Sequence, residues 1–284
     1  AGEIHAIMGP NGTGKSTLLR FLISTIDKKY VLLAPTGIAA LNIGGQTIHS
    51  FFGFSFRPYL PLDRDLPDLS KKYDLLKQLD LIIIDEISMV RADMMNAIDL
   101  SLKKILKNEL PFGGKQILLV GDLLQLPPVL DSKKEQEVKV IRENYSTEFF
   151  FSAKVFDQLD IDVIELQKVY RQEQADFVKI LNNIRIDKII EADLSRINSR
   201  YLNGHATTDE NIITLTTRNE KATAINNQQI DKLDRPEHSF PAKKTGTFLS
   251  DTNGKKLPTD DKLRLKERAQ IIFVKNDPEK KWVN

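Results

Sequence analysis

The chain has 284 residues and a mass of 32.3 kDa, a length that allows one large domain or two domains of ordinary size. Its residues are 41% hydrophobic and 28% charged, which excludes a mainly disordered chain. The absence of cysteine excludes a disulfide scaffold, a zinc finger and a cysteine nucleophile.

Charge and hydropathy limit the partners that the chain can have. Because the net charge is only +2, any surface for nucleic acid must be a local groove. No apolar run approaches the roughly 18 residues of a membrane span, and the N-terminus lacks the pattern of a signal peptide. We therefore expect no membrane partner and no targeting segment. The chain starts at Ala1 and ends in a polar turn over residues 276–284, so we expect a fragment cut at both ends.

The first chemical motif follows an apolar, strand-like run over Ile4–Met8. The segment from Gly9 to Ser16 matches the P-loop pattern, in which glycines let backbone N–H groups surround phosphate oxygens at the start of a helix. We expect Lys15 to reach the β- and γ-phosphates of ATP and the Ser16 hydroxyl to bind Mg²⁺. The nucleotide-binding residues predicted from this motif are Gly9, Gly12, Thr13, Gly14, Lys15, Ser16 and Thr17.

Two acidic residues follow a second apolar run, Leu81–Ile84. A buried strand that delivers carboxylates at its tip suits the chemistry of a magnesium-bound nucleotide, since ligands collect at that edge of a sheet. We expect Asp85 to hold Mg²⁺, and Glu86 to orient or deprotonate the attacking water. The alternative is an acidic helix N-terminus, where Asp and Glu are favoured for their charge alone.

Two further apolar runs each lead to a candidate for contact with the γ-phosphate. Ile117–Val120 is followed by Gln125, whose amide is expected to sense the γ-phosphate. Val163–Leu166 is followed by Arg171, which is expected to reach the γ-phosphate as an arginine finger. The predicted catalytic set is therefore Lys15, Asp85, Glu86, Gln125 and Arg171.

Continuous apolar runs, with Tyr30–Ala34 as a further one, alternate with helical patterns in the first half, which predicts a doubly wound α/β domain with a parallel sheet buried on both faces. Helices are predicted over residues 16–26 and 91–107, and Phe54–Tyr73 is a proline-rich inserted element. We place the first lobe at residues 1–171 and a partial second lobe at 172–284. The second contains a helical stripe from Phe177 to Ile184, a strand over 212–216, a helix over 218–233, a polar segment over 235–266 and a strand over 269–275.

The order of the motifs resembles the PIF (petite integration frequency) DNA helicases of superfamily 1. The resemblance rests on Gly12-Thr13-Gly14-Lys15-Ser16, Ala34-Pro35-Thr36-Gly37-Ile38-Ala39-Ala40, Thr47-Ile48-His49-Ser50-Phe51-Phe52, Asp85-Glu86-Ile87-Ser88-Met89, Pro111-Phe112-Gly113-Gly114, Gly121-Asp122 through Val129, and Tyr170-Arg171-Gln172. It implies two RecA-like lobes, ATP-driven 5′-to-3′ translocation on single-stranded DNA and unwinding of forked duplex DNA by a monomer. It also implies a role in DNA repair, recombination or telomere maintenance.

The same resemblance implies a DNA groove. It places Thr36, Gly37, His49, Ser50 and the turn Thr216-Thr217-Arg218-Asn219 along that groove, and makes the element over residues 54–73 a wedge at the fork. From residue type alone, Phe51, Phe52 and Phe149–Phe151 are expected in the core rather than against bases, and His49 is expected to be structural.

One segment departs from the family. Gly2–Asn11 resembles the nucleotide-binding loop of ABC-type ATPases, although no Leu-Ser-Gly-Gly signature follows, so we expect a junction on a helicase body. Two other functions therefore stay open: an ABC-type ATPase subunit, and a nucleotide-gated DNA-binding fragment that does not hydrolyse ATP. The expected compartment is the bacterial cytoplasm, or the nucleus or mitochondrion of a eukaryote.

Overall fold

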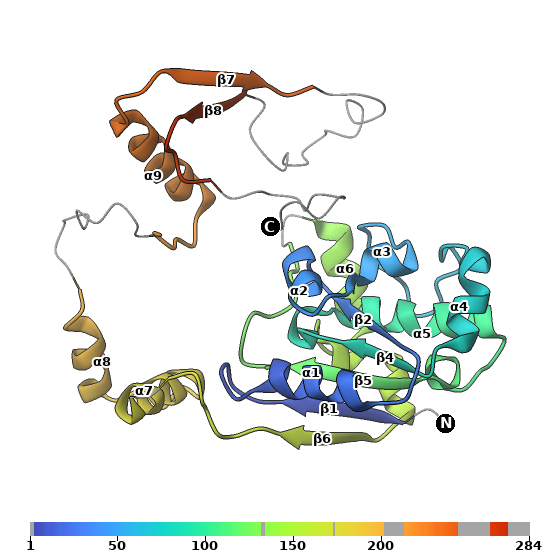
Figure 1. The fold of residues 1–284 in the computed structure, drawn as a ribbon. Helices are drawn as coiled ribbons and strands as arrows, with labels where there is room; N and C mark the ends of the chain where they lie inside the picture. The colour runs from blue at the N-terminus through green and yellow to red at the C-terminus, as the bar shows by residue number, and fades with distance from the viewer. Residues whose placement is uncertain (1–2, 132–133, 173, 202–212, 244–261, 272–284) are drawn as a thin grey trace. The chain divides into compact units, whose positions relative to one another are not determined.

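The structure is a computed structural model that describes residues 3–131, 134–172, 174–201, 213–243 and 262–271 (Figure 1). The chain divides into two compact units, Ala1–Arg200 and Tyr201–Asn284. The helical stripe that we assign to the second lobe thus groups with the first compact unit. The lobe boundary at residue 171 remains a prediction.

The first unit is built on a sheet of six parallel strands in the order β3-β2-β4-β5-β1-β6. All of the apolar runs singled out from the sequence form strands in it, and the short edge strand β3 is an addition. The strands are β1 (Ile4–Met8), β2 (Tyr30–Ala34), β3 (Gln46–Thr47), β4 (Leu81–Ile84), β5 (Gln116–Gly121) and β6 (Ile161–Glu165).

Helices connect these strands, as a parallel sheet requires, and the last two helices of the first unit follow β6. They are α1 (Lys15–Thr25), α2 (Gly37–Asn42), α3 (Ile48–Phe52), α4 (Tyr73–Gln78), α5 (Ala92–Leu106), α6 (Glu135–Asn144), α7 (Ala175–Arg185) and α8 (Glu191–Asn198), with short 3₁₀ turns at Ser70–Lys72, Ile87–Met89, Pro111–Gly114, Phe150–Ser152 and Lys154–Gln158. The helices predicted over residues 16–26 and 91–107 correspond to α1 and α5, each to within one residue.

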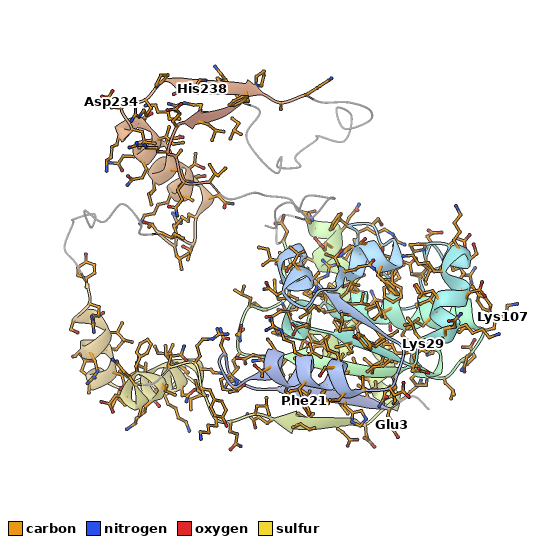
Figure 2. The ribbon with its side chains drawn as sticks, viewed as in Figure 1. Glu3, Phe21, Lys29, Lys107, Asp234 and His238 are labelled. Carbon is orange, nitrogen blue, oxygen red and sulfur yellow. The ribbon has the colours of Figure 1, made fainter. Side chains whose placement is uncertain are left out.

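Alternate residues of the central strands enter two separate cores. Leu81 and Ile83 pack on one face with Leu19 of α1, whereas Ile82 and Ile84 pack on the other face with α3 and α5. The outer side of α1 stays in solvent, where Phe21 is 62% exposed (Figure 2). The sheet is therefore covered on both faces, which explains why β4 reads as one continuous apolar run.

The edge strand β6 differs from the expectation of burial on both faces. In the part of the chain that the structure describes, the Val163 side chain is 60% exposed and the Ile164 side chain is 53% exposed. Strand β6 pairs with β1 alone in this sheet, so it has a neighbour on one side only.

Of the three consecutive phenylalanines expected in the core, Phe150 is buried and Phe151 is 43% exposed.

The inserted element over residues 54–73 packs onto the core. Tyr59 is fully buried, and its backbone N–H donates to Asp93 of α5 at 3.0 Å. Arg91 donates to both oxygens of Asp93, at 2.8 and 2.7 Å, and also pairs with Glu137 of α6. Burial alone lowers the pKa of Arg91, but these hydrogen bonds outweigh it and raise the pKa. One arginine thus holds α5, α6 and the inserted element together.

We expect Arg91→Met to destabilise the first unit by about 3–5 kcal/mol, because it leaves the buried Asp93 carboxylate without a cation and leaves Glu137 to the exposed ammonium of Lys134. Urea unfolding followed by circular dichroism measures the change. Arg57→Met is the matched control, since the Arg57 side chain is 36% exposed in its pair with Asp63. Equal losses in the two variants would contradict a central role for Arg91.

In the second unit, the described residues form α9 (Asn219–Lys232) and an antiparallel pair, β7 (Glu237–Pro241) with β8 (Lys262–Lys266). Helix α9 confirms the prediction over residues 218–233. Ile213–Thr216 and Ala269–Ile271 are not strands, contrary to prediction, and residues 212 and 272–275 lie outside the described ranges. No helix within those ranges has the length and apolar character needed to cross a membrane.

Candidate functional site

The predicted site residues of the first unit gather at one edge of the sheet. All six strands are parallel, so their carboxyl ends share that edge. The P-loop follows β1, Asp85 and Glu86 follow β4, Gln125 follows β5 and Arg171 follows β6. The candidate DNA residues Thr36 and His49 follow β2 and β3. The strand order therefore places the nucleotide candidates after four neighbouring strands, β4, β5, β1 and β6, and the DNA candidates after the remaining two, β3 and β2.

The P-loop is closed by its own side chains. Lys15 begins α1, directly after Gly14 with φ of 88°. The Lys15 ammonium donates to the carbonyl oxygens of Gly9 at 2.6 Å and Pro10 at 2.9 Å. The Thr13 hydroxyl donates to the Pro10 carbonyl at 2.8 Å, and the Ser16 and Thr17 side chains are exposed. The lysine thus spans the loop, while both hydroxyl residues of the first helical turn face solvent.

The Lys15 ammonium lies among three carboxylates. Burial lowers the pKa of Lys15, and Asp122, Glu86 and Asp85 act in the opposite direction. Attraction from these side chains shows that residues after β1, β4 and β5 share one electrostatic environment. A phosphate group placed here would meet a half-buried cation, where charge interactions are stronger than in water.

Asp85 and Glu86 occupy an unusual turn at the tip of β4. Asp85 is buried, and its Oδ1 accepts the Glu86 backbone N–H at 2.9 Å. Glu86 has φ of 51°, in the left-handed region that costs a non-glycine residue energy. Burial raises the pKa of both carboxyls, and for Glu86 the neighbouring Asp85 charge adds to the effect. Such a raised pKa is typical of a carboxylate that takes up a proton during a reaction.

The donor set at this edge fits Mg²⁺. Mg²⁺ in nucleotide sites takes one or two protein oxygens and completes its coordination with phosphate and water. Asp85 and Ser16 offer a carboxylate and a hydroxyl of this kind. Within the described ranges no three His, Asp or Glu side chains form a metal cage, so the phosphates themselves would have to contribute ligands.

The segment after β6 lies directly on the P-loop. The backbone N–H of Tyr170 donates to the Gly12 carbonyl at 2.8 Å, and Arg171 Nη1 donates to Asn11 Oδ1 at 3.0 Å. A Cβ at Gly12 would lie 2.7 Å from the Cβ of Arg171, and Gly12 has φ of 85°. Glycine is therefore required here both for its backbone and for its lack of a side chain. The Asn11 contact was not predicted, because only folding brings residues 160 positions apart together.

Gln125 is tied to a neighbour that sequence reasoning did not assign to the site. Its Nε2 donates to Asp122 Oδ2 at 3.1 Å, and Arg185 Nη2 donates to Asp122 Oδ1 at 2.8 Å. Burial by itself raises the pKa of Asp122, but the hydrogen bonds from Arg185, Gln125 and the Leu124 N–H lower it below its usual range. Asp122 is therefore an ionised acceptor for both partners.

The DNA candidates of the first unit lie at the starts of two short helices. Thr36 caps α2 by accepting the Ala39 N–H at 3.3 Å, and Thr47 caps α3 by accepting the Ser50 N–H at 3.2 Å. Gly37 and Ser50 are exposed. His49 stacks on Phe56 with ring centroids 4.5 Å apart, and burial, followed by the Arg91 charge, lowers its pKa. Because Phe56 is itself 86% exposed, the role of His49 stays a prediction.

The remaining candidates lie in the second unit. Thr216 Oγ1 accepts the Arg218 backbone N–H at 3.3 Å, and Asn219 is the first residue of α9. Thr217, Arg218 and Asn219 are exposed at this turn. Their assignment to a DNA groove stays a prediction.

Comparison with known proteins gives consistent matches. A family model described as PIF1-like helicase matches residues 1–195, and this range includes residues 2–11, for which we expected a junction. The chain is 34% identical to the ATP-dependent DNA helicase PIF1 of Saccharomyces cerevisiae over 94% of its length. It is 28% identical to the ATP-dependent DNA helicase Pif1 of Bdellovibrio bacteriovorus over 100% of its length.

Among solved structures, the chain is similar to Bacteroides Pif1 bound to single-stranded DNA. The TM-score is 0.77 at 34% identity, over 93% of this chain and 60% of that one. A structure on DNA unwinding at forked double-stranded DNA by two coordinating Pif1 helicases gives 0.77 at 33% identity, over 94% of this chain and 62% of that one. The chain spans 31% of the yeast relative and 62% of the Bdellovibrio relative.

Proposed function

Because the chain belongs to the PIF1-like helicase family, we propose that it carries the ATPase centre of a DNA helicase that moves 5′-to-3′ along single-stranded DNA. The fold is a RecA-like P-loop α/β fold, which supports this proposal. The observation that carries it is the convergence of Lys15, Asp85, Glu86 and Asp122 at one sheet edge.

The roles of the residues follow from their chemistry. Lys15 neutralises the β- and γ-phosphates, and Glu86 accepts the proton of the attacking water. Asp85 and Ser16 hold Mg²⁺, which when bound neutralises charge on the phosphate oxygens. Gln125 positions the water or the γ-phosphate, and Arg171 stabilises the charge of the transition state. Because Arg171 starts out bonded to Asn11, it has to exchange one acceptor for another.

DNA is the proposed partner because the chain is similar to a Pif1 helicase bound to single-stranded DNA, and the strand order is compatible with a groove beside the nucleotide residues. Thr36 and His49 follow strands on the β2 side of the edge, and Glu86 follows β4, which pairs with β2. Exposed polar groups at strand tips suit contacts to the phosphate backbone, which set affinity without reading the sequence. We propose single-stranded and forked DNA as substrates, a wedge role for residues 54–73, and a monomer that serves genome maintenance.

The steady-state ATPase rate with and without single-stranded DNA tests the function. A helicase ATPase is stimulated by DNA, an ABC-type ATPase hydrolyses ATP without that stimulation, and a gated DNA-binding fragment binds both ligands without turnover. We expect DNA stimulation. A rate that DNA does not change would contradict the proposal.

We also expect affinity for single-stranded DNA to fall steeply with salt and to depend little on base sequence. Each neutralised phosphate contributes about −0.7 to the slope of log K against log salt concentration. Fluorescence anisotropy with labelled oligonucleotides at several salt concentrations measures this slope. An affinity that does not change with salt would exclude a backbone groove.

A further inference from the structure

Arg185 forms a buried ion pair at the nucleotide edge, although it lies on a helix outside the motifs. It is the last residue of α7, and its Nη2 is 2.8 Å from Asp122 Oδ1. The Asp122 side chain is 2% exposed and the Arg185 side chain 23% exposed. Charges in such a place require partners, because an unpaired buried charge is costly. The pair therefore ties α7 firmly to the loop that follows β5.

The carboxylate of Asp122 connects this arginine to Gln125. Oδ1 accepts from Arg185 and from the Leu124 N–H at 3.2 Å, while Oδ2 accepts from the Gln125 amide nitrogen at 3.1 Å. An ionised carboxylate is an acceptor only, so the NH₂ end of the amide has to face it. The carbonyl oxygen of Gln125 is then the end of the amide that remains for a water molecule, which is the acceptor that an attacking water needs.

The helix that carries Arg185 has a well-defined end. Asp187 takes φ of 55°, and the Lys188 N–H donates to the Asn183 carbonyl at 2.7 Å. Asn183 in turn donates to Asp193 of α8 at 2.8 Å, and Ile180 of α7 is buried. These contacts hold the end of α7 against α8, which limits where the Arg185 guanidinium can lie.

Arg185 also acts on the P-loop lysine. The positive charge of Arg185 lowers the pKa of Lys15, whereas the negative charge of Asp122 raises it. The Nε of Arg185 is buried and has no hydrogen-bond partner within the described residues. A buried donor without a partner in a structural salt bridge is uncommon and calls for an explanation. Since its charge acts on Lys15, the guanidinium lies near the P-loop as well as beside Asp122.

We propose that Arg185 is a positioning residue for ATP hydrolysis, which acts through Asp122 to hold the Gln125 amide in its working orientation. The proposal rests on the proposed ATPase function. Under this proposal, the position of α7, which follows the last strand of the sheet, affects the rate of ATP hydrolysis. A displacement of α7 would release Asp122, and Gln125 would lose the acceptor that orients it.

A double-mutant cycle distinguishes this role from direct contact with the phosphate. The four proteins are the parent chain, Arg185→Gln, Asp122→Asn and the double variant. Each is measured for the single-turnover rate of ATP hydrolysis, for ADP affinity by calorimetry and for thermal stability. We expect Arg185→Gln to lower the rate about tenfold or more, and to change ADP affinity about twofold at most. We expect Arg185→Lys, which keeps the charge, to restore part of the rate.

The rate of the double variant, compared with that of Asp122→Asn, tests whether Arg185 acts through Asp122. If Arg185 acts only through Asp122, adding Arg185→Gln to Asp122→Asn changes the rate little, since coupled residues are not additive. Rate losses that multiply would show independent action at the phosphate and overturn the proposal. So would an unchanged rate in Arg185→Gln, or a fold-loss in rate that is matched by an equal fold-loss in ADP affinity.

Two controls separate the failure of this proposal from failure of the function. Arg196→Gln removes an arginine of α8 whose pair with Asp176 is exposed, with side chains 61% and 75% accessible, and is expected to keep the parental rate. If the parent chain itself does not hydrolyse ATP, the proposed function fails. If the parent and Arg196→Gln hydrolyse ATP and Arg185→Gln matches them, only the role of Arg185 fails.

Discussion

Lys15→Ala is expected to abolish ATP hydrolysis and to weaken the binding of Mg-ATP. Lys15 is the cation at the start of α1, and three carboxylates act on it electrostatically. Without it, the triphosphate would add negative charge beside Asp85, Glu86 and Asp122 with no fixed counter-ion from the P-loop. The loss of one preorganised hydrogen-bond donor lowers kcat by about 10²- to 10³-fold, and Lys15→Ala removes a full positive charge as well.

Calorimetry with Mg-ATP and a steady-state ATPase assay measure the two effects. Lys28→Ala is the matched control, because the Lys28 ammonium is exposed and bonds to Gln116 at the start of β5, away from the carboxyl ends of the strands. We expect that variant to behave as the parent does. If Lys15→Ala binds Mg-ATP with parental affinity, the segment Gly9–Ser16 does not hold the phosphates.

Glu86→Gln is expected to keep nucleotide binding and to lose turnover. The amide has nearly the shape of the carboxylate, but it cannot take the proton of the attacking water. General-base catalysis of this kind contributes about 10²- to 10⁴-fold. Burial already raises the pKa of Glu86, which favours its role as a proton acceptor. We therefore expect kcat to fall while the Kd for Mg-ATP stays within about threefold of the parent.

A single-turnover assay beside a binding titration separates the two quantities. Glu143→Gln on α6 is the control, since this glutamate is 60% exposed in its pair with Lys139. Two results would assign the catalytic carboxylate elsewhere: hydrolysis by Glu86→Gln at the parental rate, or an equal loss of kcat and of affinity.

Local sequence was enough to predict the main parts of the first unit. Continuous apolar runs predicted β1, β2, β4, β5 and β6 because strands of a parallel sheet need hydrophobic side chains toward both covering layers. Glycine spacing predicted the P-loop, since Gly12 and Gly14 take the left-handed φ values of 85° and 88°. The convergence of Lys15 and Asp85 followed from the rule that parallel strands end at one edge.

Sequence patterns were least informative for strands whose side chains are mostly exposed. The segment over residues 235–266 was predicted as polar turns, yet it contains β7 and β8, whose described side chains are mostly exposed. The apolar run at Val163 was predicted as buried, although β6 lies at the edge of the sheet. Hydropathy records what a side chain prefers, whereas position in the sheet decides what covers it.

Only the tertiary structure brought together the polar network around the site. Arg185 lies 63 residues from Asp122, and Asn11 lies 160 residues from Arg171. No motif spacing connects such pairs, because each hydrogen bond depends on where the loops and α7 lie in the fold. The sequence by itself determined which chemical groups reach the edge of the sheet. The packing of distant segments decided which of those groups hold one another in place, since hydrogen bonds require contact within a few ångströms.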